Sequence, residues 1–485
     1  MGIFDGVIKS RHPEYTANAT LWQRRKDAYF GGAAYIEAAL NTHRLENAGD
    51  FTERKKIATL LNYLRPICDT YATYLFRREA EWELELTGAV KYMDEAADRE
   101  GRGFLQFMKS LAPLAVDIGF VLIGIDTPTM PEGVELKSRA QEDVYGIKPY
   151  LYYIDPLDLL DWETDEDGYL VLALLRETIS DRQIVNGKVE DRGGEQYRLW
   201  TPGACIVINK DGDPIEEYVN EIGLVPIVPL KFRDTGDPIT GQGLGQDLEP
   251  IQAEILNVCS QIYEIFQRQT FSQLVAQGDA ADYGEIDSTG KAHIGKLSTA
   301  SIMIVSNDAK HMPQFISPDV SQAHLLREER DRLIDEMYRI AQLTRGSARE
   351  ATPQSGISKA FDFLDTNQAL GDFAENVAKA GQRALEIAAL YSGSKDESEL
   401  EPPADFGVVD LDADVDRLDK LVKARAPYPL IDAVVARVAE TMFPGDDDLQ
   451  KALKEEAGEK EEPPEPIDLS QFQPPEEGGK PPLTE

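Results

Sequence analysis

The stretch that decides the fold is LEPIQAEILNVCSQIYEI, residues 248–265. Its apolar residues recur in steps of 3, 4, 3, 4 and 3, at Leu248, Ile251, Ile255, Val258, Ile262 and Ile265. This heptad spacing is typical of helices that pack side by side. Pro250 suits a first helical turn, and Phe266 and Phe271 continue the pattern toward Gly278. The stretch therefore predicts a helical rod of about 30 residues and about 45 Å.

A second long helix is expected over residues 319–343, with Leu326, Leu333, Met337 and Ile340 as its apolar stripe. Its charge run, residues 327–332, predicts intrahelical pairs Glu328–Arg332 and Asp335–Arg339. The spare charges would either pair between neighbouring subunits or form a solvated face, and the sequence leaves both open. Between the two helices, residues 279–318 contain short β-like runs at 292–297 and 301–305.

The part of the chain before the rod is expected to hold helices and then a mostly antiparallel sheet. Apolar periodicity predicts helices over residues 15–29, 51–76 and 89–112. β-Branched and aromatic runs predict strands at residues 120–125, 148–154, 169–176, 197–201, 206–209 and 225–232. Gly241, Gly243 and Gly245 then join the sheet to the rod, and we interpret them as a hinge.

After the second helix, the polar segment TRGSAREATPQS, residues 344–355, predicts a loop, and residues 358–391 predict another long helix. A strand at 407–411 and helices at 415–425 and 429–443 follow. The last 25 residues hold seven prolines and seven acidic residues against one lysine, so this tail is expected to be disordered. The fold class predicted for the whole chain is α+β.

Composition limits the function. The 485 residues, 42% of them hydrophobic, suffice for more than one core. The formal charge of -37 argues against an extended surface that grips nucleic acid. Cys68, Cys205 and Cys259 have no metal-ligand spacing and indicate no disulfide framework. No secretory signal is readable, and the most apolar stretch is too short to span a bilayer, so a protein that uses no membrane is expected.

Motifs that carry catalysis fail at decisive positions. Residues 290–296 match the spacing of a phosphate loop, but Leu297 stands where the magnesium-binding Ser or Thr is required, so a turn between strands is the better interpretation. Residues 163–168 imitate the start of a calcium loop, but Leu174 replaces its bidentate Glu, so an acidic hairpin turn is expected. We therefore predict no enzyme, no cofactor and no metal site.

The order of these elements resembles that of the portal proteins of tailed bacteriophages. Several strings add to the resemblance: residues 153–162 with 167–170 and Arg176-Glu177, residues 222–230, residues 248–267 and residues 353–360. The likeness covers about residues 15 to 440.

This resemblance implies a portal-type fold with named parts. Residues 1–245 would form the wing, 246–278 the first stem helix, 279–318 the clip and 319–343 the second stem helix. Residues 344–357 would form the tunnel loop, 358–398 a long wing helix, 399–460 the crown and 461–485 the disordered acidic tail. The seam residues Ile251, Ile255, Val258, Ile262, Ile265, Leu326, Leu333, Met337 and Ile340 would pack the stem.

The resemblance also implies a function: a ring, usually of twelve subunits, at one capsid vertex, through which double-stranded DNA is packaged and ejected. Partners would be DNA bound without sequence specificity, the terminase large subunit, a head-tail adaptor, the major capsid protein and scaffold. Assembly would take place in the host cytoplasm, and the protein would end in the virion.

Two groups of residues are candidates for contacts within this implied machine. Arg345, Ser347, Arg349, Thr352 and Gln354 of the tunnel loop would face DNA, although Arg345 and Arg349 could instead form intersubunit salt bridges. Lys291, His293 and Lys296 would lie on the clip surface that meets partners.

Two other classes of protein are weighed against the portal. One is an elongated virion or scaffold protein without a DNA channel, in which the long helices form a plain bundle. The other is a metal-dependent hydrolase using Asp165 and Asp167, for which no convergent set of ligands is found.

Overall fold

The computed structural model describes residues 2–44, 46–77, 82–128, 148–180, 193–269, 321–343 and 356–403, with short pieces elsewhere between 182 and 438. The chain divides into two compact units, one of residues 1–353 with 364–406 and one of residues 354–363 with 407–485. In the second unit the described residues include short helical pieces at 420–423, 430–432 and 434–436. The predicted strand 407–411 and the acidic tail lie outside the described residues.

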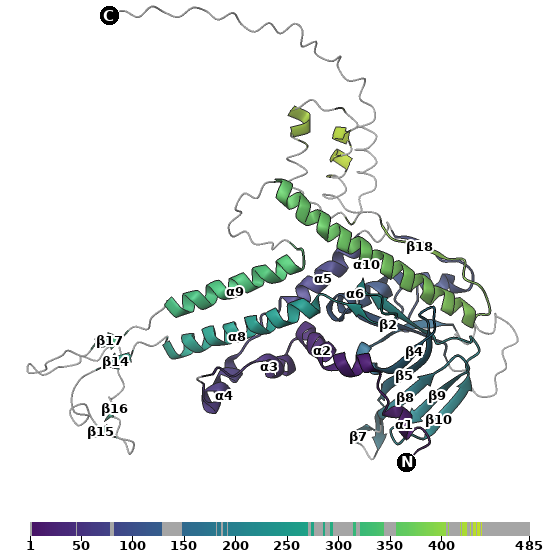
Figure 1. Cartoon of the computed structure of the whole chain (residues 1–485), viewed down its shortest axis with the longest axis horizontal. Coiled ribbons are helices and arrows are strands. Elements are labelled where there is room, and N and C mark those ends of the chain that lie inside the picture. The colour runs from purple at the N-terminus through teal and green to yellow at the C-terminus, as the bar shows by residue number, and fades with distance from the viewer. Residues whose placement is uncertain are drawn as a thin grey trace, which may run out of the picture. The chain divides into compact units, whose positions relative to one another are not determined.

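Two antiparallel sheets form the centre of the first unit (Figure 1). The larger has the strand order β10-β9-β8-β5-β4. Its strands are β4 (Leu159–Thr164), β5 (Leu170–Ile179), β8 (Gly194–Trp200), β9 (Ala204–Asn209) and β10 (Pro214–Val219). The smaller has the order β11-β2-β3, from β2 (Phe120–Asp126), β3 (Tyr150–Ile154) and β11 (Ile227–Lys231). The antiparallel sheet is confirmed, and β4 and β10 are strands that the sequence analysis missed.

Further short strands extend or flank the sheets. β6 (Arg182–Val185) pairs with β7 (Lys188–Asp191), and β12 (Arg233–Asp234) pairs with β13 (Gly241–Gln242). β1 (Glu83–Glu85) pairs with β18 (Glu399–Glu401), with Leu84 opposite Leu400. Residues 399–401, at the predicted start of the crown, therefore pair with the N-terminal part of the chain, and the crown itself stays a prediction.

Helices from the N-terminal part pack against these sheets or against the long helix that follows them (Figure 1). They are α1 (Asp5–Ile8), α2 (Pro13–Phe30), α3 (Ala33–Ala39), α4 (Ala48–Ile57), α5 (Leu64–Leu75) and α6 (Phe104–Ile118). One apolar core joins Trp22 of α2 and Ile118 of α6 to Phe120, Trp162 and Trp200 of the strands. The mixed helical and antiparallel composition confirms the α+β class.

Two of the predicted N-terminal helices are wrong in extent. The helix predicted over 51–76 is divided into α4 and α5. In an unbroken helix the ring of Pro66 would clash with the backbone carbonyl of residue 62, four positions earlier. The helix predicted over 89–112 is a 3₁₀ turn, Gly88–Asp94, followed by α6. Gly101, with φ of 79°, lies in the left-handed region and separates the two.

Three long helices follow the sheets: α8 (Gly245–Gln269), α9 (Ser321–Ile340) and α10 (Gly356–Tyr391). The predictions for α9 and α10 are confirmed to within a few residues. The rod predicted to reach Gly278 is too long, because β14 (Gln273–Val275) is already a strand paired with β17 (Gln314–Ile316). Within β14, Leu274 lies opposite Phe315 of β17, and Val275 is a β-branched residue that favours a strand over a helix.

Candidate functional site: the paired long helices

α8 and α9 lie side by side as an antiparallel pair (Figure 1). The chain leaves α8 into β14 and returns to α9 from β17, and the two strands pair with Gln273 opposite Ile316. The outgoing and returning segments therefore remain adjacent past the ends of the helices. A further pair of short strands, β15 (Glu285–Ile286) and β16 (Ala292–His293), lies between them in the sequence.

The predicted seam residues are all buried or partly buried. Ile255, Val258 and Ile262 of α8 are buried, as are Leu333 and Met337 of α9. The others, Ile251, Ile265, Leu326 and Ile340, are partly buried. The heptad pattern thus identified buried or partly buried positions on both helices, and their role in stem packing stays a prediction. A fully buried side chain of this size stabilises the folded state by about 2 kcal/mol.

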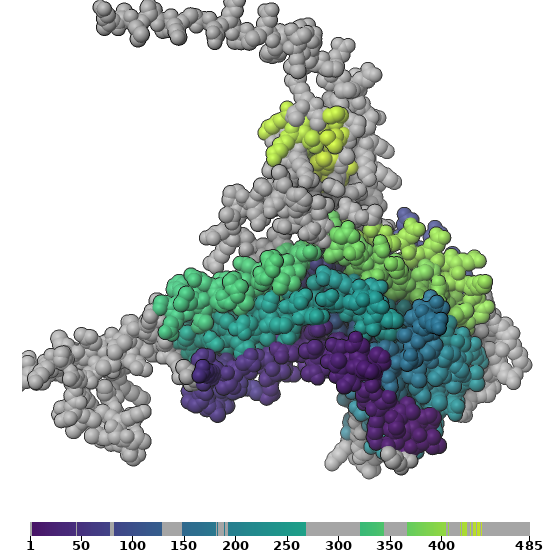
Figure 2. Space-filling view, viewed as in Figure 1, coloured from purple at the N-terminus to yellow at the C-terminus, as the bar shows by residue number. Residues whose placement is uncertain are grey.

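The opposite side of α8 is covered by the N-terminal helices, which the sequence analysis did not foresee. Figure 2 shows the surface of α8 as a band between α9 and the N-terminal part of the chain. Asn257 donates a hydrogen bond of 3.0 Å from Nδ2 to the carbonyl of Ala39, and its Oδ1 accepts one of 2.8 Å from the backbone N–H of Asn41. α8 is therefore the central member of a three-layer packing.

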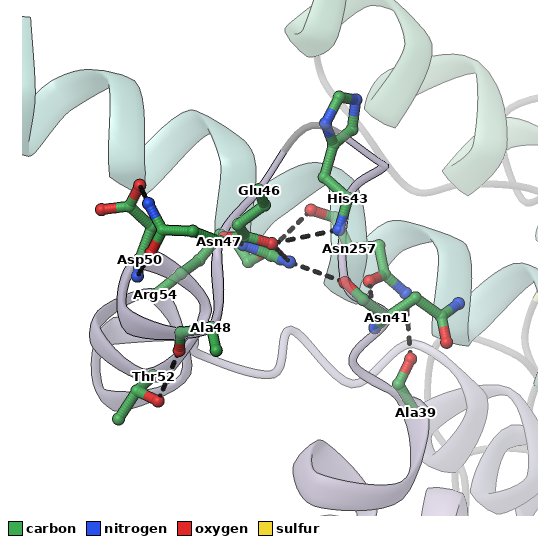
Figure 3. A network of polar contacts seen from close by, with 11 residues as sticks. Ala39, Asn41, His43, Glu46, Asn47, Ala48, Asp50, Thr52, Arg54 and Asn257 are labelled. Atoms are coloured by element: carbon green, nitrogen blue, oxygen red, sulfur yellow. Dashed lines mark hydrogen bonds and ion pairs between the residues drawn. The ribbon is translucent and has the colours of Figure 1, made fainter.

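Arg54 of α4 is the centre of the polar network at this contact (Figure 3). Its guanidinium group donates to both carboxylate oxygens of Glu46, at 2.8 and 2.7 Å, to the carbonyl of Asn41 at 2.6 Å and to Oγ of Ser260 at 2.6 Å. Only 2% of Arg54 is exposed. These hydrogen bonds hold the pKa of Glu46 below its usual range. A buried charge with all these partners fixes one register of α8 against α4.

The ion pairs on the outer face of α9 differ from the prediction. Arg332 pairs with Glu329 at 2.6 Å, and Arg339 pairs with Glu336 at 2.5 Å. Both are i,i+3 pairs, whereas i,i+4 pairs with Glu328 and Asp335 were predicted. Residues three and four apart are both neighbours on a helix surface, so the sequence alone does not choose between them.

Gly241, Gly243 and Gly245 provide close packing, and the interpretation as a hinge is wrong. A Cβ atom at Gly243 would overlap the carbonyl oxygen of Asp117 and the backbone nitrogen of Gly119. One at Gly241 would overlap the carbonyl oxygen of Gly119. These glycines let the strand before α8 lie directly against the end of α6, which fixes where α8 begins.

A buried group of charged side chains stands at this junction. Asp117 is fully buried, and neither of its carboxylate oxygens has a hydrogen-bond partner among the described residues. Burial raises the pKa of this carboxyl well above its usual range, while the nearby Arg25 opposes and Glu249 adds to that shift. Glu249 itself accepts hydrogen bonds from Arg24 at 2.7 Å and from the Tyr35 hydroxyl at 2.9 Å. The sequence analysis did not identify Asp117 as a residue of this site.

Several predicted contact residues are not placed by the structure. Arg345, Ser347, Arg349, Thr352 and Gln354 of the tunnel loop, with Lys291 and Lys296 of the clip, lie outside the described residues. His293 is in β16, where its partner in register is Glu285. Their proposed roles therefore stay predictions.

Among the residues that the structure describes, no group of three or more His, Cys, Asp or Glu side chains could hold a metal ion. The predicted acidic hairpin turn is confirmed: Asp165 Oδ1 accepts hydrogen bonds from the backbone N–H groups of Asp167 and Tyr169, at 3.0 and 2.8 Å, between β4 and β5. In the same part of the chain, no helix is both long and apolar enough to cross a membrane. The three cysteines are free and buried.

Comparison with known proteins gives likenesses to solved structures but none to a protein family or a curated sequence. No family model matches the chain, and no curated protein matches its sequence. Among solved structures, the chain is similar to one from the virion of a native gene transfer agent (GTA) particle. The two share 12% identity and a TM-score of 0.38 over 90% of this chain and 93% of the other.

Proposed function

We propose that this protein is a structural subunit of a phage-like virion, and that within it the chain acts as the portal. Copies of the chain would form a ring at one capsid vertex, through which double-stranded DNA is packaged and later ejected. The observation that carries the proposal is the antiparallel pair α8 and α9, joined through β14 and β17 to a segment at its far end.

The length of the pair supports a role at a distance from the sheets. At about 1.5 Å per residue, α8 spans about 38 Å from its start beside α6. β14 and β17 follow and precede the ends of α8 and α9 that are farther from α6. In the proposed ring the segment between β14 and β17 forms a clip that docks first the terminase large subunit and then a head-tail adaptor, with Lys291, His293 and Lys296 on its polar face. The major capsid protein and scaffold would be the remaining partners.

The net negative charge of the chain supports a channel through which DNA slides instead of a surface that binds DNA tightly. With 87 acidic and 50 basic residues, a channel wall made from this protein would repel phosphate groups. A basic wall would instead hold the duplex through release of counterions and slow its passage. Within this proposal, Arg345 and Arg349 supply weak contacts to the DNA backbone, and the protein performs no catalytic step.

Electron images of the purified full-length protein, combined with mass measurement of the same sample, test the proposal. We expect closed rings, usually of twelve subunits in the capsid, with a bore wide enough for a duplex. A stable monomer would overturn the proposal. An elongated bundle without a bore would also overturn it, and would favour the virion or scaffold protein that has no channel.

A further inference from the structure

A hole opens on one side of the α8–α9 pair. It has a volume of about 370 Å³ and lies between Cys259, Tyr263 and Phe266 of α8 and Arg327 and Arg330 of α9. Cys259 is buried at this site, while Phe266 is 39% exposed. The Arg327 guanidinium carbon lies 5.1 Å from the centre of the Phe266 ring, a cation–π contact. Asp331 also lines the hole and forms an ion pair of 2.7 Å with Arg330. The hole therefore has aromatic and aliphatic walls on α8 and a charged rim on α9, where Arg327 is the cation that is stacked on Phe266.

The same helix pair carries an exposed apolar side chain on another side. Leu325 of α9 is 66% exposed. It precedes Arg327 by two residues, which places the two side chains about 200° apart around the helix axis. Glu328 is three residues after Leu325 and so lies beside it on that outward face. This side of α9 is thus an apolar knob with an adjacent carboxylate.

The knob and the hole are complementary in both polarity and charge. An aliphatic side chain beside an acid matches the aromatic walls of the hole and the guanidinium group of Arg327 at its rim. Because the two features point to different sides of one helix pair, they cannot meet within the chain. They can meet between two copies, in a head-to-tail contact that repeats around an axis.

We infer that a second copy of this chain docks on the α8–α9 pair, with Leu325 of one copy in the hole of the next and Glu328 facing Arg327. The inference rests on the proposed function, which requires a ring, and it names the contact that joins neighbours. The same contact would assign Phe266 and Tyr263 as the walls that receive the knob.

Disulfide trapping tests this contact in the full-length protein. Leu325→Cys and Tyr263→Cys are combined in a Cys259→Ala background, so that no native thiol remains in the hole. Mild oxidation should then link neighbouring copies into multimers that reduction separates. Either single variant should give none. Leu390→Cys with Tyr263→Cys is the matched control, because Leu390 is an exposed leucine of α10.

Rings in electron images without cross-linking of the Leu325→Cys/Tyr263→Cys pair would overturn this inference and leave the portal proposal standing. Cross-linked multimers without closed rings would support the contact and overturn the portal proposal. Neither rings nor cross-links would overturn both. Circular dichroism of each variant shows that it is folded.

Exchanging the charges of Glu328 and Arg327 gives a second test of the contact, and it requires no introduced cysteine. Glu328→Arg places like charges together and should weaken self-association by roughly 10-fold or more, as should Arg327→Glu. The double variant restores opposite charges across the contact and should recover most of the loss. Failure of the double variant to recover, with both single variants folded and weakened, would overturn the assignment of Glu328 to Arg327.

Discussion

A Cβ atom at Gly245 would overlap the carboxylate oxygen Oδ1 of Asp117, which is fully buried. The first residue of α8 and the last turn of α6 are therefore in direct contact, with no room for a side chain between them. The backbone N–H of Leu244 also donates a hydrogen bond of 2.7 Å to the carbonyl of Val116. The direction in which the long helix leaves the sheets is set at this contact.

Gly245→Ala should destabilise the protein by about 2 kcal/mol, because the added methyl group forces Asp117 or α8 to move within a packed region. Gly371→Ala is the matched control, since a Cβ atom at Gly371 meets nothing within 4 Å in α10. It should stabilise by up to about 1 kcal/mol, as alanine does inside a helix. Urea unfolding followed by tryptophan fluorescence measures both. Equal effects of the two substitutions would contradict the close packing at Gly245.

The free energy of unfolding of the Asp117→Asn variant should increase relative to that of the wild type as the pH rises. The pKa of Asp117 is raised in the folded state, so the folded protein holds this proton at pH values where the unfolded chain has lost it. Wild-type stability from this group is fully present below the unfolded pKa and falls by up to about 1.4 kcal/mol per pH unit as pH rises toward the folded pKa. Asparagine, which does not titrate, removes that loss.

The control for this titration is Asp372→Asn, at an exposed position of α10. Urea unfolding at several pH values from 4 upward gives the stability of each variant relative to the wild type. A difference between Asp117→Asn and the wild type that stays constant with pH would show that the buried carboxyl does not titrate in this range.

The sequence predicted those elements in which one local period dominates. The spacing of Ile255, Val258 and Ile262 identified the packed face of α8, and the run from Phe120 identified β2, because each pattern reflects burial on a known face. β10 was missed because all six of its residues are exposed, so no apolar alternation marks it. The break between α4 and α5 was missed because the apolar positions continue across it.

Of the candidate site, the sequence predicted the two long helices and their apolar positions, but not the polar contacts of α8 with the N-terminal helices. The contacts of Arg54 with Ser260 and of Asn257 with Asn41 join residues about 200 positions apart, and nothing local marks such pairs. The glycines before α8 were noticed in the sequence but misinterpreted. A glycine that is needed for flexibility and one that is needed for close packing look identical in a sequence.

Arg54→Ala should destabilise the protein by about 2 kcal/mol or more, because it leaves the partly buried Glu46 carboxylate and the Asn41 carbonyl without their partner. Lys56→Ala, in the same helix, removes an exposed pair with Glu53 and should cost less than about 0.5 kcal/mol. Urea unfolding compares the two. If both cost the same, the network in Figure 3 does not anchor α4 to α8.

Replacing Arg345 and Arg349 with glutamate should reduce the DNA that each particle packages or retains. The substitutions convert the basic side chains of the segment 344–355 into acids, which repel phosphate. Lys210→Glu with Lys395→Glu makes the same change in net charge at two exposed positions and should leave packaging unchanged. DNA per particle, measured after nuclease treatment of particles assembled with each variant, distinguishes them. If the arginine variant fills and retains DNA as the wild type does, the two arginines do not contact DNA. Intersubunit salt bridges are then the favoured role, and the isolated assembly of the variant should dissociate into smaller species when its mass is measured.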